Sequence, residues 1–321
     1  MTRYSIQPID AAGLKTISIH DRGGKVRSEH LARPWQPGEG MLGLLDSMPR
    51  LLAADSLRSV IGAMIDARAK KKQIIWGLGG HVVKCGLAPI LIHLMKRGWA
   101  TAFSMNGSAA IHDFEIAIAG QTSEDVEAVL PDGRFGTASE TATEMNQAIV
   151  EAQADGIGMG EAYGKRLDGM SGLLNGGQSL VLEAYRASVP LTVHVAVGTD
   201  TPHSHPSASG AGIGAATHRD FLLFGSLVAG LNDGGVYLNV GSAVIMPEVF
   251  LKAVSLVRNL GNPLAGFTTV NFDFLQHYRP RVNVVERPHA SAGGKGYAIT
   301  GHHEIMIPLL AACLAECEID R

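Results

Sequence analysis

The sequence predicts an α/β fold with an open, parallel, Rossmann-like sheet that carries helices on both faces. Three observations support this prediction. Short apolar runs alternate with longer amphipathic segments over most of the 321 residues, which is the pattern of repeated βαβ units. A glycine-rich turn joins the first predicted strand to the helix that follows it. The hydrophobic share of 46% is enough for one large buried core.

The regular elements begin near residue 56. Residues 1–50 are rich in proline, glycine and charge, so we expect an N-terminal arm, with residues 51–321 as a single α/β domain. The first helix is indicated by apolar residues at the spacing of one helical face, namely Leu57, Val60, Ile61, Met64 and Ile65. A buried strand at 73–78, a helix that ends at Gly98 and a second strand at 99–107 then form the first βαβ unit.

The alternation continues to the C-terminus. Further helices are predicted at 179–189, 218–231, 246–261 and 304–319, and further strands at 190–198, 234–241 and 266–274. Parallel strands end at one common edge of the sheet, and ligands of such sheets bind beyond that edge. The segments that follow the predicted strands are rich in Gly, Ser, Asn, His and Asp, so we expect the functional site there.

The glycine turn after the first strand contains Gly77, Gly79 and Gly80. Glycines before a helix let an anion approach the free backbone N–H groups, which suits a phosphate. The dinucleotide fingerprint G-x-G-x-x-G nevertheless fails, because its sixth position is Val82, and no phosphate-loop lysine motif follows. The turn alone is therefore consistent with a nucleotide site or with a merely tight strand-to-helix connection.

Composition limits the classes of partner. The formal net charge of -3 gives no concentrated basic field, so we expect neither nucleic acid nor a membrane as partner. Three cysteines without a C-x-x-C pair favour a reducing compartment. With no apolar stretch of membrane-spanning length and no signal-peptide pattern near the start, we expect a cytoplasmic protein with a small-molecule substrate.

The segment GGHVVKCGLAPILIHLMKRGWATAFSMNGSAAIHD, at 79–113, resembles the first βαβ unit of the deoxyhypusine synthase family. Gly86 matches the helix glycine of that family, Met105, Asn106 and Gly107 match its second turn, and His112 with Asp113 matches its His-Asp or Glu-Asp pair. Later patches are similar too: VGTD places Asp200, and LNVGSAVIMPEVFLKA and GHHEIMIPLLAACLAE match a glycine turn and the closing helix. The likeness extends in patches from Leu57 to the C-terminus.

The resemblance implies an NAD-binding α/β domain and a homotetramer. The cofactor-binding residues that it implies lie in four short segments: Gly79, Gly80, His81, Val82, Val83 and Lys84; Asn106, Gly107 and Ser108; Gly241 and Ser242; His302 and His303. The family's activity is an NAD-dependent transfer of an aminoalkyl group from a polyamine to an amine acceptor, through an imine with an active-site lysine.

The residues that the resemblance assigns to catalysis are Lys295 as the covalent amine, with His112, Asp113 and Asp200 as polar partners. This sequence departs from the family around the lysine. Gly293 stands where the family has a tryptophan, Pro247 and Glu248 take the place of a histidine, and a basic loop, HYRPRVNVVERP, replaces an acidic substrate loop. A basic loop is a poor host for a polyamine.

Two alternatives remain open from the residues themselves. Thirteen histidines are many, and imidazoles that converge from separate loops can bind a metal ion and support hydrolysis. The metal-ligand candidates are His203, His205, His302 and His303, and His112 and His289 lie in further histidine-bearing segments. The second alternative is a nucleotide-binding protein without turnover. Cys85, at the start of the first crossover helix, is more typical of a small buried residue than of a nucleophile.

Overall fold

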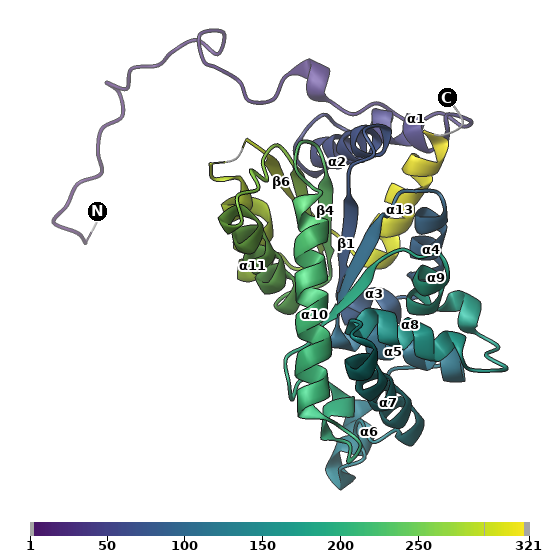
Figure 1. Ribbon diagram of the computed structural model, residues 1–321. Coiled ribbons are helices and arrows are strands. Elements are labelled where there is room, and N and C mark those ends of the chain that lie inside the picture. The colour runs from purple at the N-terminus through teal and green to yellow at the C-terminus, as the bar shows by residue number, and fades with distance from the viewer. Residues whose placement is uncertain (1–2, 292, 318–321) are drawn as a thin grey trace.

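Six parallel strands form one sheet in the order β3-β2-β1-β4-β5-β6. The structure is a computed structural model, which describes residues 3–291 and 293–317 (Figure 1). The strands are β1 (Ile74–Leu78), β2 (Ala102–Asn106), β3 (Leu191–His194), β4 (Val236–Val240), β5 (Thr268–Asp273) and β6 (Lys295–Thr300). The chain order reverses direction between β1 and β4, so the two halves of the sheet diverge there. This architecture confirms the predicted Rossmann-like fold class.

Alternation along the strands places apolar side chains on both faces of the sheet. Ile75 and Tyr237 belong to the core on the side of α10 (Gly210–Ala229) and α11 (Ile245–Asn259). The neighbouring residues Trp76 and Leu238 belong to the larger core on the other side. That core is covered by α2 (Leu52–Ala69), α4 (Ala88–Lys96), α9 (Leu180–Arg186) and α13 (His303–Glu316). The sheet is therefore the middle of three layers.

The predicted helix after the glycine turn is in fact two helices. The short α3 (Gly80–Lys84) ends at Cys85, and α4 begins only at Ala88. Gly86 separates them with a φ of +76°, a left-handed conformation that favours glycine. Pro89 then lies in the first turn of α4, where its missing N–H costs no helical hydrogen bond. The apolar periodicity runs across this break, which is why the sequence suggests one helix.

Several elements were not predicted. Helices α5 (Gly107–Ala119), α6 (Val126–Val129), α7 (Ser139–Asp155) and α8 (Met159–Asp168) fill the region between β2 and α9. The Asn106 side chain accepts a hydrogen bond from the Ala109 N–H and so caps α5 immediately after β2. The short α12 (Tyr278–Pro280) precedes a π-helical turn at Arg281–Glu286. Strand β6 has two exposed and polar ends and lacks the apolar run typical of a buried strand.

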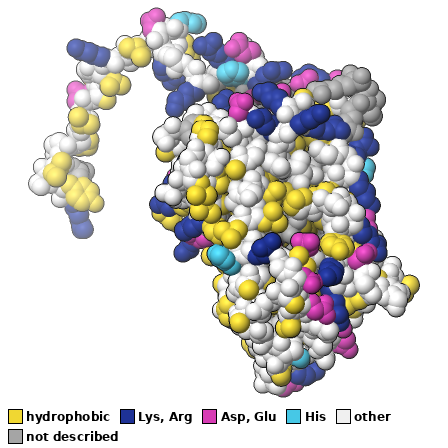
Figure 2. Space-filling view, viewed as in Figure 1, with side chains coloured by type: hydrophobic (Ala, Val, Ile, Leu, Met, Phe, Trp, Pro, Cys, Tyr) yellow, Lys and Arg dark blue, Asp and Glu magenta, His cyan; other side chains and the backbone are white. Residues whose placement is uncertain are grey.

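The N-terminal segment leaves the body of the protein. Residues 3–39 are exposed apart from a few partly buried positions, and apolar side chains such as Ile6, Ile9 and Ile17 face solvent. Figure 2 shows hydrophobic side chains along this extended segment. Helix α1 (Gly40–Ser47) packs on α13, where the Met41 and Leu42 N–H groups donate to the Glu316 carboxylate at 2.7 and 2.8 Å. Among the described residues, no helix is long and apolar enough to cross a membrane.

Candidate functional site at the carboxyl edge of the sheet

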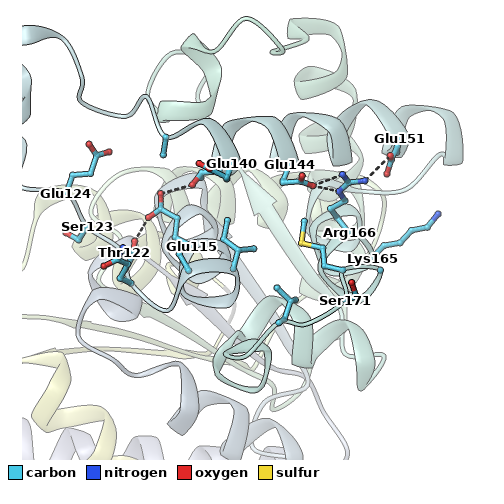
Figure 3. A pocket seen from close by; sticks show the side chains of 18 residues that line it. Glu115, Thr122, Ser123, Glu124, Glu140, Glu144, Glu151, Lys165, Arg166 and Ser171 are labelled. Carbon is cyan, nitrogen blue, oxygen red and sulfur yellow. Dashed lines mark hydrogen bonds and ion pairs between the residues drawn. The ribbon is translucent and has the colours of Figure 1, made fainter.

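Two adjoining cavities lie beyond the carboxyl ends of β1, β2 and β3. The smaller, of about 180 Å³, is lined by residues from α3, α5 and the loop after β3, and we call it the edge cavity. The larger, of about 1210 Å³, lies between α5, α7 and α8, and we call it the acidic pocket (Figure 3). Glu115, Ser123 and Glu124 line both. This is the sheet edge at which the sequence predicted a site.

The edge cavity brings together four residues that the sequence singled out. Lys84 comes from α3, Ser108 and His112 from α5, and Asp200 from the loop after β3. The short α3 and the start of α5 pack against each other because Gly80 leaves room for the Ser108 side chain. In the same way, Gly107 leaves room for the Asp200 carboxylate. Glycines therefore allow the three chain segments to meet closely.

His112 is held by a chain of hydrogen bonds that fixes its tautomer. The Thr122 hydroxyl donates its one proton to the Glu115 carboxylate, so it accepts a hydrogen bond from His112 Nδ1 at 2.7 Å. Nε2 is then the unprotonated nitrogen. Burial, together with the nearby Lys84 ammonium, lowers the pKa of His112 to about 4. At neutral pH the imidazole is uncharged and Nε2 is a proton acceptor.

Asp200 is a polar group of the edge cavity with incomplete hydrogen bonding. Its Oδ2 atom is buried and has no hydrogen-bond partner among the described residues. Burial raises the pKa of Asp200 to about 6. An unsatisfied buried carboxylate oxygen is costly for folding, and this one packs against the backbone of Gly107.

The acidic pocket is dominated by glutamates. Glu115, Glu124, Glu140, Glu144 and Glu151 line it, and Figure 3 shows them around the opening. Its two basic residues are already paired. Arg166 contacts Glu144 at 2.6 Å and Glu151 at 3.4 Å, and Lys165 lies 2.6 Å from Asp155. The remaining carboxylates favour a cationic ligand. Sequence reasoning missed most of these residues, although Glu140, Glu144 and Glu151 lie near one another along a single helix.

The glycine turn is closed by the protein itself. A side-chain carbon at Gly79 would overlap the Gly241 carbonyl oxygen, and one at Gly241 would contact the His303 ring. The Gly79 N–H also donates to the Val240 carbonyl at 2.9 Å. Ser242, a predicted cofactor contact, is buried and caps α11 through the Met246 N–H at 3.1 Å. Along 79–84, the exposed side chains are those of His81 and Lys84, while Gly79, Gly80, Val82 and Val83 are buried.

Asp113 does not line either cavity. It is fully buried and accepts hydrogen bonds from the Ser179 hydroxyl, the Leu180 N–H at 2.7 Å and the Val181 N–H at 3.0 Å. These donors belong to the start of α9, so the carboxylate orients that helix. Burial raises its pKa to about 6. The structure gives this predicted catalytic residue a positioning role.

Lys295 and His289 lie at the other edge of the sheet. Lys295 is the first residue of β6 and pairs with Thr268, the first residue of β5, so its exposed side chain is at the amino edge. His289 contacts Thr269 near that same edge, with Nε2 at 2.7 Å from the hydroxyl oxygen. Within one chain, the structure does not bring Lys295 together with His112 and Asp200.

The four histidines proposed as metal ligands are divided. His203 and His205 stabilise their own loop, since their Nδ1 atoms accept the Gly198 and Ser207 N–H groups, each at 3.2 Å. His302 is exposed and His303 is buried beside β5, with Nε2 at 3.2 Å from the Phe272 carbonyl oxygen. Among the described residues, three other side chains come together, those of His81, Cys85 and Glu304. Each offers one ligand atom, and these three atoms lie within 4.8 Å of one another.

No family model matches the chain, and no curated protein is significantly similar to it in sequence. Solved structures are similar in fold. A conserved LOR/SDH protein from Methanococcus maripaludis S2 has a TM-score of 0.51 at 14% identity, over 82% of this chain and 70% of that one. AgrE, in a ternary complex with ornithine and NAD+, has a TM-score of 0.52 at 15% identity, over 83% of this chain but only 33% of AgrE.

A protein from Entamoeba histolytica that is described as a candidate deoxyhypusine synthase has a TM-score of 0.46 at 10% identity, over 87% of this chain and 94% of that one. This last likeness is too weak to support an inference. The chain spans about a third of the length of AgrE. These similarities establish the fold and do not establish the activity.

Proposed function

We propose that the protein is an NAD-dependent enzyme that oxidises an amine-bearing substrate in the cavities at the carboxyl ends of β1, β2 and β3. The observation that carries this proposal is the meeting of an uncharged histidine and an unsatisfied carboxylate beside a pocket lined by glutamates. The fold shared with AgrE, which binds ornithine and NAD+, is consistent with it.

The residues of the edge cavity suit a dinucleotide better than the glycine turn does. The turn is filled by Gly241, Ser108 and His303. Beside it, the Lys84 ammonium and the amino end of α5 suit a phosphate group. The Asp200 carboxylate, which lines this cavity, suits the hydroxyls of a ribose. Lys84, Ser108 and Asp200 would therefore hold the cofactor.

The acidic pocket suits the substrate. Glu115, Glu124 and Glu140 are not paired with its arginine or lysine, which contact other acids. Glu115 accepts hydrogen bonds from the Thr122 and Thr141 hydroxyls. Such a surface attracts protonated amines such as those of a polyamine or a basic amino acid. The basic loop noted in the sequence belongs to residues 277–288, at α12 and the π-helical turn, and none of these residues lines the pocket.

His112 would take the proton that amine oxidation releases. NAD held by Lys84, Ser108 and Asp200 would supply the hydride acceptor for the carbon that carries the amine. The nitrogen loses a proton in the same oxidation, and the Nε2 atom of the neutral His112 is the available acceptor. Thr122 and Glu115 hold the ring by Nδ1 and stabilise the charge that forms. The product is an imine.

The transfer step of deoxyhypusine synthase is not part of this proposal. It requires a lysine amine at the imine carbon, and Lys295 lies at the amino edge of the same chain's sheet. An imine formed here would be hydrolysed by water or trapped by a free amine. A homo-oligomer that brings Lys295 of a second copy to the cavity would restore the transfer.

The test has a binding arm and a catalytic arm. NAD is titrated into the full chain by calorimetry, and we expect Lys84→Ala or Asp200→Ala to weaken binding at least about tenfold, while Lys252→Ala, an exposed lysine on α11, does not. Reduction of NAD is then followed with spermidine, putrescine and ornithine. We expect His112→Gln to lower the rate by about 100-fold or more, and His218→Gln, an exposed histidine on α10, to leave it unchanged. No NAD binding, or equal rates for the two histidine variants, would overturn the proposal.

A further inference from the structure

We propose that His81, Cys85 and Glu304 bind one divalent transition-metal ion, best matched by Zn²⁺, between α3 and α13. This site lies outside both cavities described above. Its ligands differ from the histidine set that the sequence suggested, since neither His203 nor His205 takes part.

The distances between the ligand atoms match those around a metal ion. His81 Nε2 lies 3.2 Å from Cys85 Sγ, and Cys85 Sγ lies 3.6 Å from Glu304 Oε2. Tetrahedral zinc has bonds of about 2.0 to 2.3 Å, which place its ligand atoms roughly 3.3 to 3.6 Å apart. The third pair, His81 and Glu304, lies within 4.8 Å, so the three ligand atoms surround a space in which one ion would contact all of them after side-chain adjustment.

The local sequence explains this convergence. His81 and Cys85 are four residues apart at α3 and its C-terminal cap, so they lie on one side of it. Glu304 is the second residue of α13 and approaches from the loop after β6. A thiolate and a carboxylate together carry two negative charges, which balance a divalent ion, and imidazole, thiolate and carboxylate are all common zinc ligands.

The order of the three residues argues against a catalytic cysteine. A nucleophilic triad requires the histidine to lie between the cysteine and the acid. Here the cysteine lies in the middle, in contact with both His81 and Glu304. A negatively charged neighbour disfavours a free thiolate, whereas a shared cation satisfies all three groups at once.

His302 is the best-placed fourth ligand. Its Nδ1 atom lies 3.8 Å from Glu304 Oε1, and its side chain is 67% exposed. The ring stacks on Phe274 at 6.3 Å between centroids, and Phe274 also contacts the His81 ring at 5.6 Å. Phe274 thus holds both imidazoles near the proposed ion and shields one side of it.

Cobalt substitution tests the site without any measurement of activity or of nucleotide binding. The full chain is treated with chelator and titrated with Co²⁺, and we expect one ion per chain with the near-ultraviolet charge-transfer absorption of a cobalt thiolate. Zn²⁺ should displace the cobalt and abolish the band. Cys85→Ser should remove the band and weaken Co²⁺ binding by about 100-fold, whereas Cys317→Ser, at the C-cap of α13 and outside the group, should keep both.

His81→Gln and Glu304→Gln serve as second variants that keep the thiol and guard against a folding artefact of Cys85→Ser. Each should weaken Co²⁺ binding by about tenfold or more, and His302→Ala by less. The proposal is overturned if Co²⁺ binds without a thiolate band. It is equally overturned if no stoichiometric ion binds, or if Cys317→Ser loses the band while Cys85→Ser retains it.

Discussion

The two halves of the sheet use polar residues at their carboxyl ends in opposite ways. At β1, β2 and β3, His112 and Asp200 line a cavity, and Asp200 has an unpartnered oxygen. At β4, β5 and β6, the amide nitrogens are bonded within the protein: Asn239 donates to Asn271 at 2.7 Å, and Asn271 donates to Gln276 at 2.7 Å. In the first half polar side chains line a cavity, whereas in the second these amide nitrogens bond to neighbouring side chains, and Asn239 Oδ1 has no partner among the described residues.

This difference shows why a polar residue after a strand is a weak sign of function. Buried amides and carboxylates must be hydrogen-bonded wherever they occur, so structural and functional positions have similar residue types. What separates them is the remaining bonding capacity and an adjacent space. The partly buried Asp200 has both, whereas Asp113, which is fully buried, has neither. Variants of each kind of residue make the contrast measurable.

The largest effect is expected at Asp113. Asp113→Ala leaves the Ser179 hydroxyl and the Leu180 and Val181 N–H groups without their acceptor. Each buried donor without a partner costs about 1 to 3 kcal/mol, so we expect the free energy of unfolding to fall by about 3 kcal/mol or more. Urea denaturation measures this change. A loss below about 1 kcal/mol would mean that Asp113 does not position α9.

Asp200→Asn should instead stabilise the protein at high pH. Burial raises the pKa of Asp200 to about 6, so the folded state disfavours the ionised form and the native protein loses stability as the pH rises from about 4 through 6. The amide avoids this loss. We expect a gain of about 1 to 3 kcal/mol at pH 8 that vanishes below pH 4, together with weaker NAD binding.

Thermal unfolding across this pH range checks the prediction for Asp200, with Asp55→Asn, an exposed aspartate of α2, as the control. The control should show no comparable pH dependence. If Asp200→Asn is destabilising at pH 8, the carboxylate has a partner within the protein, and its role as a ligand acceptor fails.

A smaller loss is expected in the closed half of the sheet. Asn271→Ala removes the acceptor of Asn239 and the donor to Gln276. We expect a loss of about 1 to 2 kcal/mol in the free energy of unfolding, with unchanged NAD affinity and amine turnover. Chemical denaturation and calorimetry on one preparation measure both. A change in NAD affinity would show that the β4–β6 half also contributes to the site.

The smallest effect is expected at Lys295. Its side chain is exposed at the amino edge of β6, so Lys295→Ala should change the free energy of unfolding by less than about 0.5 kcal/mol. Reduction of NAD by amines should also remain at the native rate. Loss of activity in this variant would indicate that Lys295 of a second copy completes the site, and the transfer chemistry of deoxyhypusine synthase would then be favoured.

The sequence predicted what depends on local periodicity. Five of the strands and the helices that cover the sheet could be read from apolar spacing, because burial on one or both faces leaves that pattern. The left-handed Gly86 and the exposed ends of β6 leave no such pattern, and the α3–α4 break and the sixth strand were missed. Lys84, Ser108, His112 and Asp200 were singled out as candidates, and the structure brings them together.

What the sequence could not give are contacts between distant segments. Gly79 looked open in the sequence, but it is covered by Gly241 from the turn after β4. Cys85 looked like a small buried residue, and its partner Glu304 lies near the other end of the chain. The acidic pocket depends on α7 packing beside α5, which no short motif records. The substrate side of the site was therefore the least predictable part.

The break at Gly86 makes α3 a separate short helix, and this separation has a consequence for binding. This single helical turn carries both Lys84, which lines the edge cavity, and His81, which belongs to the proposed metal site, and Gly86 separates it from α4. An ion bound by His81, Cys85 and Glu304 would fix α3 against α13. It would also fix the position of Lys84, which is part of α3. Binding of the cation would then increase the affinity for the cofactor, and binding of the cofactor would increase the affinity for the cation.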